Sequence, residues 1–124
     1  MRYLPAVKVV VLIVEDEPII RMLAADMVEE AGFEVLEAGN ADEAVRILES
    51  RPDVRIVFTD IDMPGSMNGL KLAAAVRRRW PPIEIVLTSG HRSISASELP
   101  ERSVFFPKPY GHGLVVAALR QLAA

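Results

Sequence analysis

The chain has no cysteine, so neither a disulfide nor a thiolate metal site can form. It has no excess of basic residues either: 14 Lys and Arg stand against 17 Asp and Glu, a formal net charge of −3. A general nucleic-acid-binding surface is usually basic, so we expect no direct nucleic-acid partner. Internal repeats, low-complexity tracts and linkers are also lacking in the 124 residues. We therefore expect a single domain over residues 1–124, with no output domain in this chain.

A membrane-spanning apolar run is missing as well. The N-terminus, MRYLPAVKVVVLIVEDE, has one early Arg and an apolar run, as a signal peptide does. However, Lys8 interrupts the run, the acids 15–17 end it, and no small-residue cleavage site follows. We interpret this segment as a buried strand and expect a cytoplasmic protein without a membrane partner.

Apolar residues make up 51% of the chain, and five runs of them are typical of strands. The first run is almost continuous, as a strand covered on both faces requires, whereas the second alternates and fits an edge position. The five predicted strands cover residues 8–14, 33–38, 54–59, 83–88 and 103–106.

Helical patterns lie between these runs. The first begins at Pro18 and stops at Gly32, and the second begins with a capping pair, Asn40 and Glu43. Further helices are predicted over 68–80 and 114–123. The segment after the fourth strand is rich in serine and poor in apolar anchors, so we expect at most a marginal helix there. Alternation of this kind predicts an α/β fold, a parallel sheet with helices on both faces.

Polar side chains follow the strands at the points where they end. Glu15 and Asp16 follow the first strand, Asp60 the third, Thr88 ends the fourth, and Lys108 follows the fifth. The carboxyl ends of parallel strands share one edge of a sheet, so these side chains are expected to converge. Three clustered carboxylates repel one another, and a hard cation that prefers oxygen ligands, Mg²⁺ above all, relieves the repulsion. A phosphoryl group can then be accepted on a carboxylate and bound by the ammonium and the hydroxyl.

A forced turn follows Asp60. In the stretch TDIDMPG, Pro64 fixes φ and Gly65 tolerates unusual backbone angles. Regular structure is therefore expected to stop directly after the two acids, Asp60 and Asp62.

Four motifs, VEDE, TDIDMPG, LTSG and FFPKPY, occur in order at these strand ends. With them the chain resembles the receiver domain of two-component response regulators over essentially its whole length. The resemblance implies a flavodoxin-like, doubly wound (βα)5 three-layer sandwich with a five-stranded parallel sheet in the order 2-1-3-4-5. It also implies a cis peptide bond between Lys108 and Pro109.

The resemblance also implies residue roles. Asp60 would be the phosphoacceptor, Asp16 and Asp60 would ligate Mg²⁺ directly, and Glu15 would act through water. The main-chain carbonyl of Asp62 would be a further ligand. The remaining roles are phosphoryl binding by Thr88 and Lys108, and a switch formed by Thr88 and Phe105.

The implied partners are a sensor histidine kinase or phosphotransfer protein as donor, and a downstream protein target or a missing output domain. The module would catalyse only its own phosphotransfer and dephosphorylation. We expect its signal to appear on a face built from residues 91–106 and the last helix.

Two departures from the family pattern stand out. The loop from Asp60 to Gly69 is one residue longer than the commonest form, and position 62 is acidic while position 90 is glycine. In the family, positions 62 and 90 flank the phosphoryl group and influence its hydrolysis.

Two alternatives stay open. The stretch DIDMP is similar to the nucleophile pair of haloacid-dehalogenase-like phosphatases, although that pair normally follows the first strand and no Asp occurs after Asp62. A degenerate receiver acting as a constitutive docking domain is the other, although all five site positions carry suitable residues.

Overall fold

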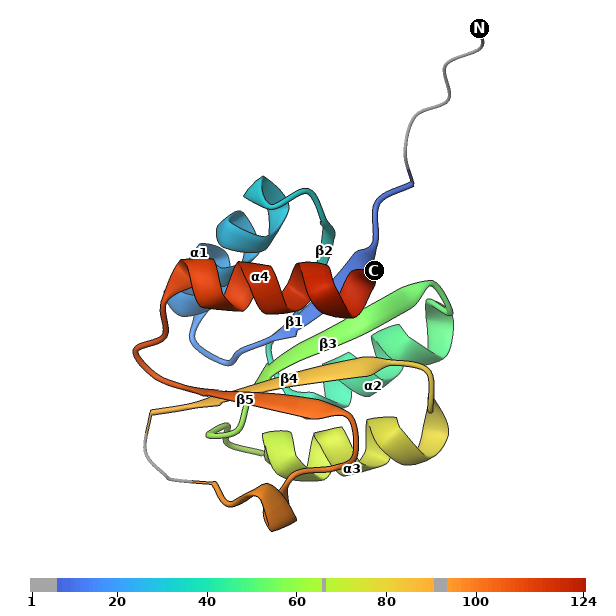
Figure 1. The fold of residues 1–124 in the computed structure, drawn as a ribbon. Coiled ribbons are helices and arrows are strands. Elements are labelled where there is room, and N and C mark those ends of the chain that lie inside the picture. The colour runs from blue at the N-terminus through green and yellow to red at the C-terminus, as the bar shows by residue number, and fades with distance from the viewer. Residues whose placement is uncertain (1–6, 66, 91–93) are drawn as a thin grey trace, which may run out of the picture.

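The computed structural model describes residues 7–65, 67–90 and 94–124. Figure 1 shows a central sheet between two layers of helices. The described elements are, in chain order, β1 (Val10–Val14), α1 (Pro18–Glu30), β2 (Glu34–Ala38), α2 (Ala41–Ser50), β3 (Val54–Asp60), α3 (Gly69–Arg79), β4 (Glu84–Ser89), a 3₁₀ turn (Ala96–Glu98), β5 (Ser103–Pro107) and α4 (His112–Ala123).

The sheet is parallel with the order β2-β1-β3-β4-β5, which confirms the predicted topology. Helices α1 and α4 cover one face and α2 and α3 the other (Figure 1). β1 is buried along its whole length, whereas β2 lies at an edge and exposes Glu34 and Glu37, as its alternating sequence predicts.

The core consists of two apolar clusters, one on each face of the sheet. Alternate side chains of the central strands point to opposite faces, so Val11 and Ile13 pack towards α1 and α4 while Leu12 and Val14 pack towards α2 and α3. Because both faces are packed, the strand ends are held rigidly. The polar residues at those ends therefore start from fixed positions.

The predicted starts of the first three helices are confirmed, whereas α4 begins at His112, two residues before the predicted start. Pro18 occupies the first turn of α1. The side chain of Asn40 accepts a hydrogen bond from the N–H of Glu43 at 2.9 Å, and the Glu43 carboxylate accepts one from the N–H of Gly39 at 2.8 Å. Asn68 caps α3 in the same way, with Lys71 N–H as donor at 3.0 Å.

The expectation of at most a marginal helix after β4 is confirmed within the described residues, where four α-helices accompany the five strands of the (βα)5 fold. Between β4 and β5 the described residues contain only the 3₁₀ turn, and residues 91–93 lie outside the described part of the chain. Serine disfavours helix interiors, and the Ser95 hydroxyl here is hydrogen-bonded to the side chains of Ser97 and Glu98.

The Arg77 side chain links α3 to the loop that contains this turn and to the connection before β4. The Arg77 guanidinium of α3 donates hydrogen bonds to the carbonyls of Pro81, Ile83 and Glu101 at 2.7–2.8 Å and to that of Arg102 at 3.2 Å. Arg77 thus joins the end of α3 to both the start of β4 and the segment before β5.

Candidate functional site

Three carboxylates meet at the carboxyl edge of the sheet. Glu15 and Asp16 follow the end of β1, and Asp60 is the last residue of β3. One oxygen from each lies within 4.8 Å of the others. Glu15 and Asp60 are 5% and 7% exposed, so two of these charges are largely shielded from water.

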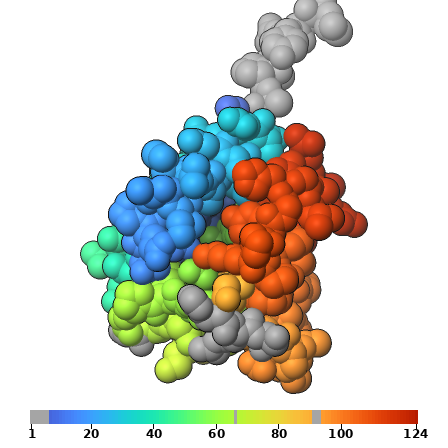
Figure 2. Space-filling view, turned by 90° about the vertical axis from the view of Figure 1, so that its left-hand side faces the viewer, coloured from blue at the N-terminus to red at the C-terminus, as the bar shows by residue number. Residues whose placement is uncertain are grey.

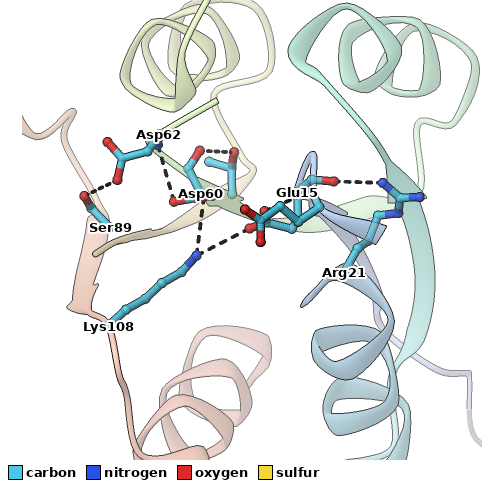
Figure 3. A network of polar contacts seen from close by, with 8 residues as sticks. Glu15, Arg21, Asp60, Asp62, Ser89 and Lys108 are labelled. Carbon is cyan, nitrogen blue, oxygen red and sulfur yellow. Dashed lines mark hydrogen bonds and ion pairs between the residues drawn. The ribbon is translucent and has the colours of Figure 1, made fainter. Parts of the chain in front are cut away.

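The ammonium group of Lys108, the residue after β5, points at this cluster (Figure 3). The Nζ atom of Lys108 lies 3.3 Å from Asp60 Oδ2 and 3.5 Å from Glu15 Oε2. The peptide bond between Lys108 and Pro109 is cis, as expected from the resemblance. Residues 93 positions apart in the sequence are thereby brought into contact.

The charges in this cluster perturb one another. Burial raises the pKa of Glu15 from its ordinary value of 4.5 to about 7, and the Asp60 charge adds to the rise. The N–H of Glu17 and the Lys108 ammonium act in the opposite direction. For Lys108, burial lowers the pKa, but the Asp60 and Glu15 carboxylates outweigh it and leave the pKa raised.

This donor set fits a magnesium ion. The residues offer oxygen ligands only, and their charge and spacing suit a small hard cation better than a transition metal. The site holds three carboxylates but one ammonium group, and it is partly buried. The uncompensated negative charge would be neutralised by a bound cation.

Thr88 belongs to the same site. It pairs with Asp60 between β3 and β4, is 3% exposed, and shares with Asp60 and Lys108 the wall of a small cavity of about 20 Å³. Phe105 does not reach the site: it pairs with Leu87, is half-buried, and packs against the core on the α2 and α3 face.

The loop after Asp60 is held close to it. The N–H of Asp62 points at Asp60 Oδ1 at 3.3 Å, and Gly65 has φ +110°, as the expected turn requires. Gly69, the first residue of α3, donates its N–H to Ile61 O at 3.0 Å. A side chain there would place Cβ 2.7 Å from the Cα of Ile61, so only glycine fits.

Three residues of this site carry no signal that sequence reasoning detected. Arg21 of α1 donates to the main-chain carbonyl of Glu15 at 2.9 Å and pairs with Glu37 at 3.4 Å. Ser89 donates its hydroxyl to Asp62 Oδ2 at 2.6 Å. Gly69 is the third, because its backbone lies against that of Ile61. Each depends on a contact between separate elements, which local patterns do not encode.

An apolar groove opens beside the site, between α1 and the segment leading into α4. It encloses about 390 Å³ and is lined by Ile20, Leu23, Ala24, Met27, Lys108, Pro109, Tyr110 and His112. Leu23, which lines the groove, is 57% exposed. In Figure 2 the blue surface of α1 and the orange and red surface of the α4 side border a hollow. A second cavity of about 220 Å³, the acidic cavity, is lined by Glu15, Asp16 and Asp60. Ile20 and Lys108 line both the groove and the acidic cavity, so the two adjoin.

Residues 11–118 match the family of response regulator receiver domains. The chemotaxis protein CheY of Thermotoga maritima is 35% identical over 118 residues, which is 91% of this chain and 96% of that protein. A crystal structure of a response regulator receiver protein from Sinorhizobium medicae has a TM-score of 0.86 at 28% identity, covering 93% of this chain and 94% of that one. Response regulator TrrA of Thermotoga maritima, crystallised with Mg²⁺ and BeF, has a TM-score of 0.80 at 27% identity, covering 94% and 99%.

The chain therefore belongs to the response regulator receiver domain family, the signalling modules of two-component systems. Its cluster of Glu15, Asp16 and Asp60 is consistent with the magnesium and phosphoacceptor site of that family. The phosphatase alternative is set aside, because the match to receiver domains extends over most of the chain.

The chain spans about a fifth of the length of the NtrX-type regulators that it also matches. Among the described residues, every helix is too short or too polar to cross a membrane.

Proposed function

We propose that this receiver takes a phosphoryl group from a phosphohistidine onto Asp60, in the presence of Mg²⁺, and thereby switches a protein-interaction face. The donor would be a sensor histidine kinase or a phosphotransfer protein. The observation that carries the proposal is the convergence at Asp60, whose carboxylate lies within 4.8 Å of two further acids and 3.3 Å from the Lys108 ammonium.

The transfer itself requires few groups. A carboxylate oxygen of Asp60 attacks phosphorus, the bond from phosphorus to the donor's imidazole nitrogen breaks, and the imidazole leaves with the electron pair. Asp16, Asp60 and the Asp62 main-chain carbonyl would hold Mg²⁺, with Glu15 acting through water. The bound cation would neutralise charge on the phosphoryl oxygens. Lys108 would pair with one of those oxygens, which requires it to leave Asp60 Oδ2.

The apolar groove is the surface best suited to the donor protein. It adjoins the acidic cavity, and Leu23 and Ile20 offer exposed apolar area along it. A donor helix with an apolar face would bury these side chains and bring its imidazole to Asp60.

The output side of the proposal concerns Thr88 and Phe105. When Thr88 turns to bind a phosphoryl oxygen, space opens beneath the loop after β4, and Phe105 rotates inward. Phe105 is half-buried, so inward rotation would increase its apolar contact. Residues 94–106 and α4 would carry the change. Residues 91–93 of the predicted face lie outside the described part of the chain.

Labelling with a small phosphoryl donor tests the proposal. With Mg²⁺ and phosphoramidate or acetyl phosphate, intact mass should show one added phosphoryl group, and EDTA should prevent it. Asp60→Asn should abolish the addition, because an amide is a poor nucleophile. Asp26→Asn, the same change at an exposed position of α1, is the matched control. Unchanged labelling of Asp60→Asn would show that the acceptor lies elsewhere.

A further inference from the structure

The end of β4 holds both loops that form the site. Thr88 O accepts the N–H of Ile61 at 2.8 Å, and Ser89 O accepts the N–H of Lys108 at 2.9 Å. The Ser89 hydroxyl adds a third tie, to Asp62 Oδ2 at 2.6 Å. Ser89 is 1% exposed, so its hydroxyl is fixed by a packed environment. This side-chain tie has no part in phosphotransfer as proposed above.

Asp62 is oriented in two directions at once. Its N–H points at Asp60 Oδ1, while its carboxylate is turned away from Asp60 towards Ser89 (Figure 3). Asp62 nevertheless lines the same cavity of about 220 Å³ as Asp60. A rotation of its side chain would place a carboxylate in the space through which water reaches Asp60.

Loss of a phosphoryl group from Asp60 requires such a water. The water oxygen bonds to phosphorus, and the bond from phosphorus to the Asp60 oxygen breaks with its electron pair returning to the carboxylate. The water proton passes to a phosphoryl oxygen, which leaves inorganic phosphate. Because the transition state is loose, the protein contributes mainly by orienting the attacking water with a hydrogen-bond acceptor. In this cavity the Asp62 carboxylate is suited to that task, and the Ser89 hydroxyl competes for it.

We propose that Ser89 is a positioning residue that prolongs the lifetime of the phosphoryl group on Asp60 by holding the Asp62 carboxylate away from the attacking water. The inference rests on the proposed function, since it presupposes phosphorylation of Asp60. It assigns the lifetime of the signal to a hydroxyl that lies outside the metal ligands.

The test is the half-life of labelled protein after the small donor is removed. Ser89→Ala should shorten the half-life about tenfold, because a hydrogen bond to a charged acceptor shifts a local equilibrium by at least about that factor. Asp62→Ala in the same background should cancel the effect, since the released carboxylate is then gone. Ser50→Ala, at a hydroxyl at the end of α2, is the matched control and should leave the half-life unchanged.

A purely structural role for Ser89 predicts a different pattern. It would shorten the half-life equally with or without the Asp62 carboxylate, and that result, or an unchanged half-life in Ser89→Ala, overturns the inference. Asp62→Ala alone provides a test that does not depend on the folding of the Ser89 variant: its half-life should equal or exceed that of the native protein, and a shorter one overturns the inference. Failure of every variant to be labelled would instead contradict the proposed function.

Discussion

Removal of one negative charge should stabilise the metal-free protein, and the effect should depend on pH. Glu15 is 5% exposed and lies beside Asp60. Its burial, and to a lesser extent the Asp60 charge, raise the pKa of Glu15 from 4.5 to about 7. At 1.36 kcal/mol for each tenfold change in proton affinity, this rise corresponds to about 3 kcal/mol. Glu15→Gln removes the charge but keeps an oxygen that can accept the N–H of Glu17. Lys108 keeps Asp60 as a partner at 3.3 Å.

The sign follows from linkage. The folded protein binds the Glu15 proton more tightly than the unfolded chain does, so the unfolded chain releases it first as pH rises. The stability that this proton contributes is complete below about pH 4.5 and is lost as pH rises through about 7. In EDTA, Glu15→Gln should therefore match the native protein near pH 4.5 and exceed its free energy of unfolding by about 3 kcal/mol at pH 8.

Urea unfolding followed by fluorescence measures this difference, since Trp80 is the single tryptophan. Glu29→Gln, on the exposed side of α1, makes the same chemical change away from the site and should show no such pH dependence. Mg²⁺ at pH 8 should stabilise the native protein more than Glu15→Gln. If the difference between Glu15→Gln and the native protein is the same at pH 4.5 and pH 8, the electrostatic reasoning is wrong.

Three further outcomes are expected. In the same urea assay, Gly69→Ala should lower the free energy of unfolding by about 2 kcal/mol, because its Cβ would lie 2.7 Å from the Cα of Ile61. Gly113→Ala in α4 should raise the free energy of unfolding by about 0.5–1 kcal/mol, because its Cβ would enter open space. Thr88→Ala should still accept a phosphoryl group but lose most of the backbone NMR shifts that beryllofluoride, a phosphoryl mimic, induces in residues 94–106; retained shifts would contradict the switch. Leu23→Glu should slow transfer from a phosphorylated phosphotransfer protein at least about tenfold while labelling by acetyl phosphate stays normal, and equal effects on both would argue against docking in the groove.

The sequence predicts much of this fold because its signals are local. Continuous apolar runs mark the buried strands, and Pro18 and Asn40 mark helix starts that the structure confirms. Parallel topology then places the carboxyl end of every strand on one edge, so the sequence alone predicts that Asp60, Thr88 and Lys108 share one site. In the structure they line one cavity.

The rest depends on contacts between elements. The serine-rich composition predicts a marginal segment after β4, but the hydrogen bonds from Arg77 to the carbonyls of Glu101 and Arg102 follow only from the packed arrangement. The tie between Ser89 and Asp62 joins residues 27 positions apart, and neither belongs to a pattern with a fixed period. The exposure of Leu23 was equally hidden, because the periodicity of α1 suggests that its apolar residues are buried.

The dependence of the segment before β5 on Arg77 has a consequence for how such a module can be tuned. Where a full helix covers a sheet edge, its resting position is set by many apolar contacts, and a single substitution changes it little. Here the Arg77 guanidinium, near the end of α3 and away from Asp60, donates two hydrogen bonds to this segment, at Glu101 and Arg102, and two more to the connection between α3 and β4. Under the proposed switch, the balance between the resting and signalling arrangements would therefore be adjustable at Arg77, at a distance from Asp60. The threshold of the proposed response and its proposed phosphoacceptor would then be set by separate residues.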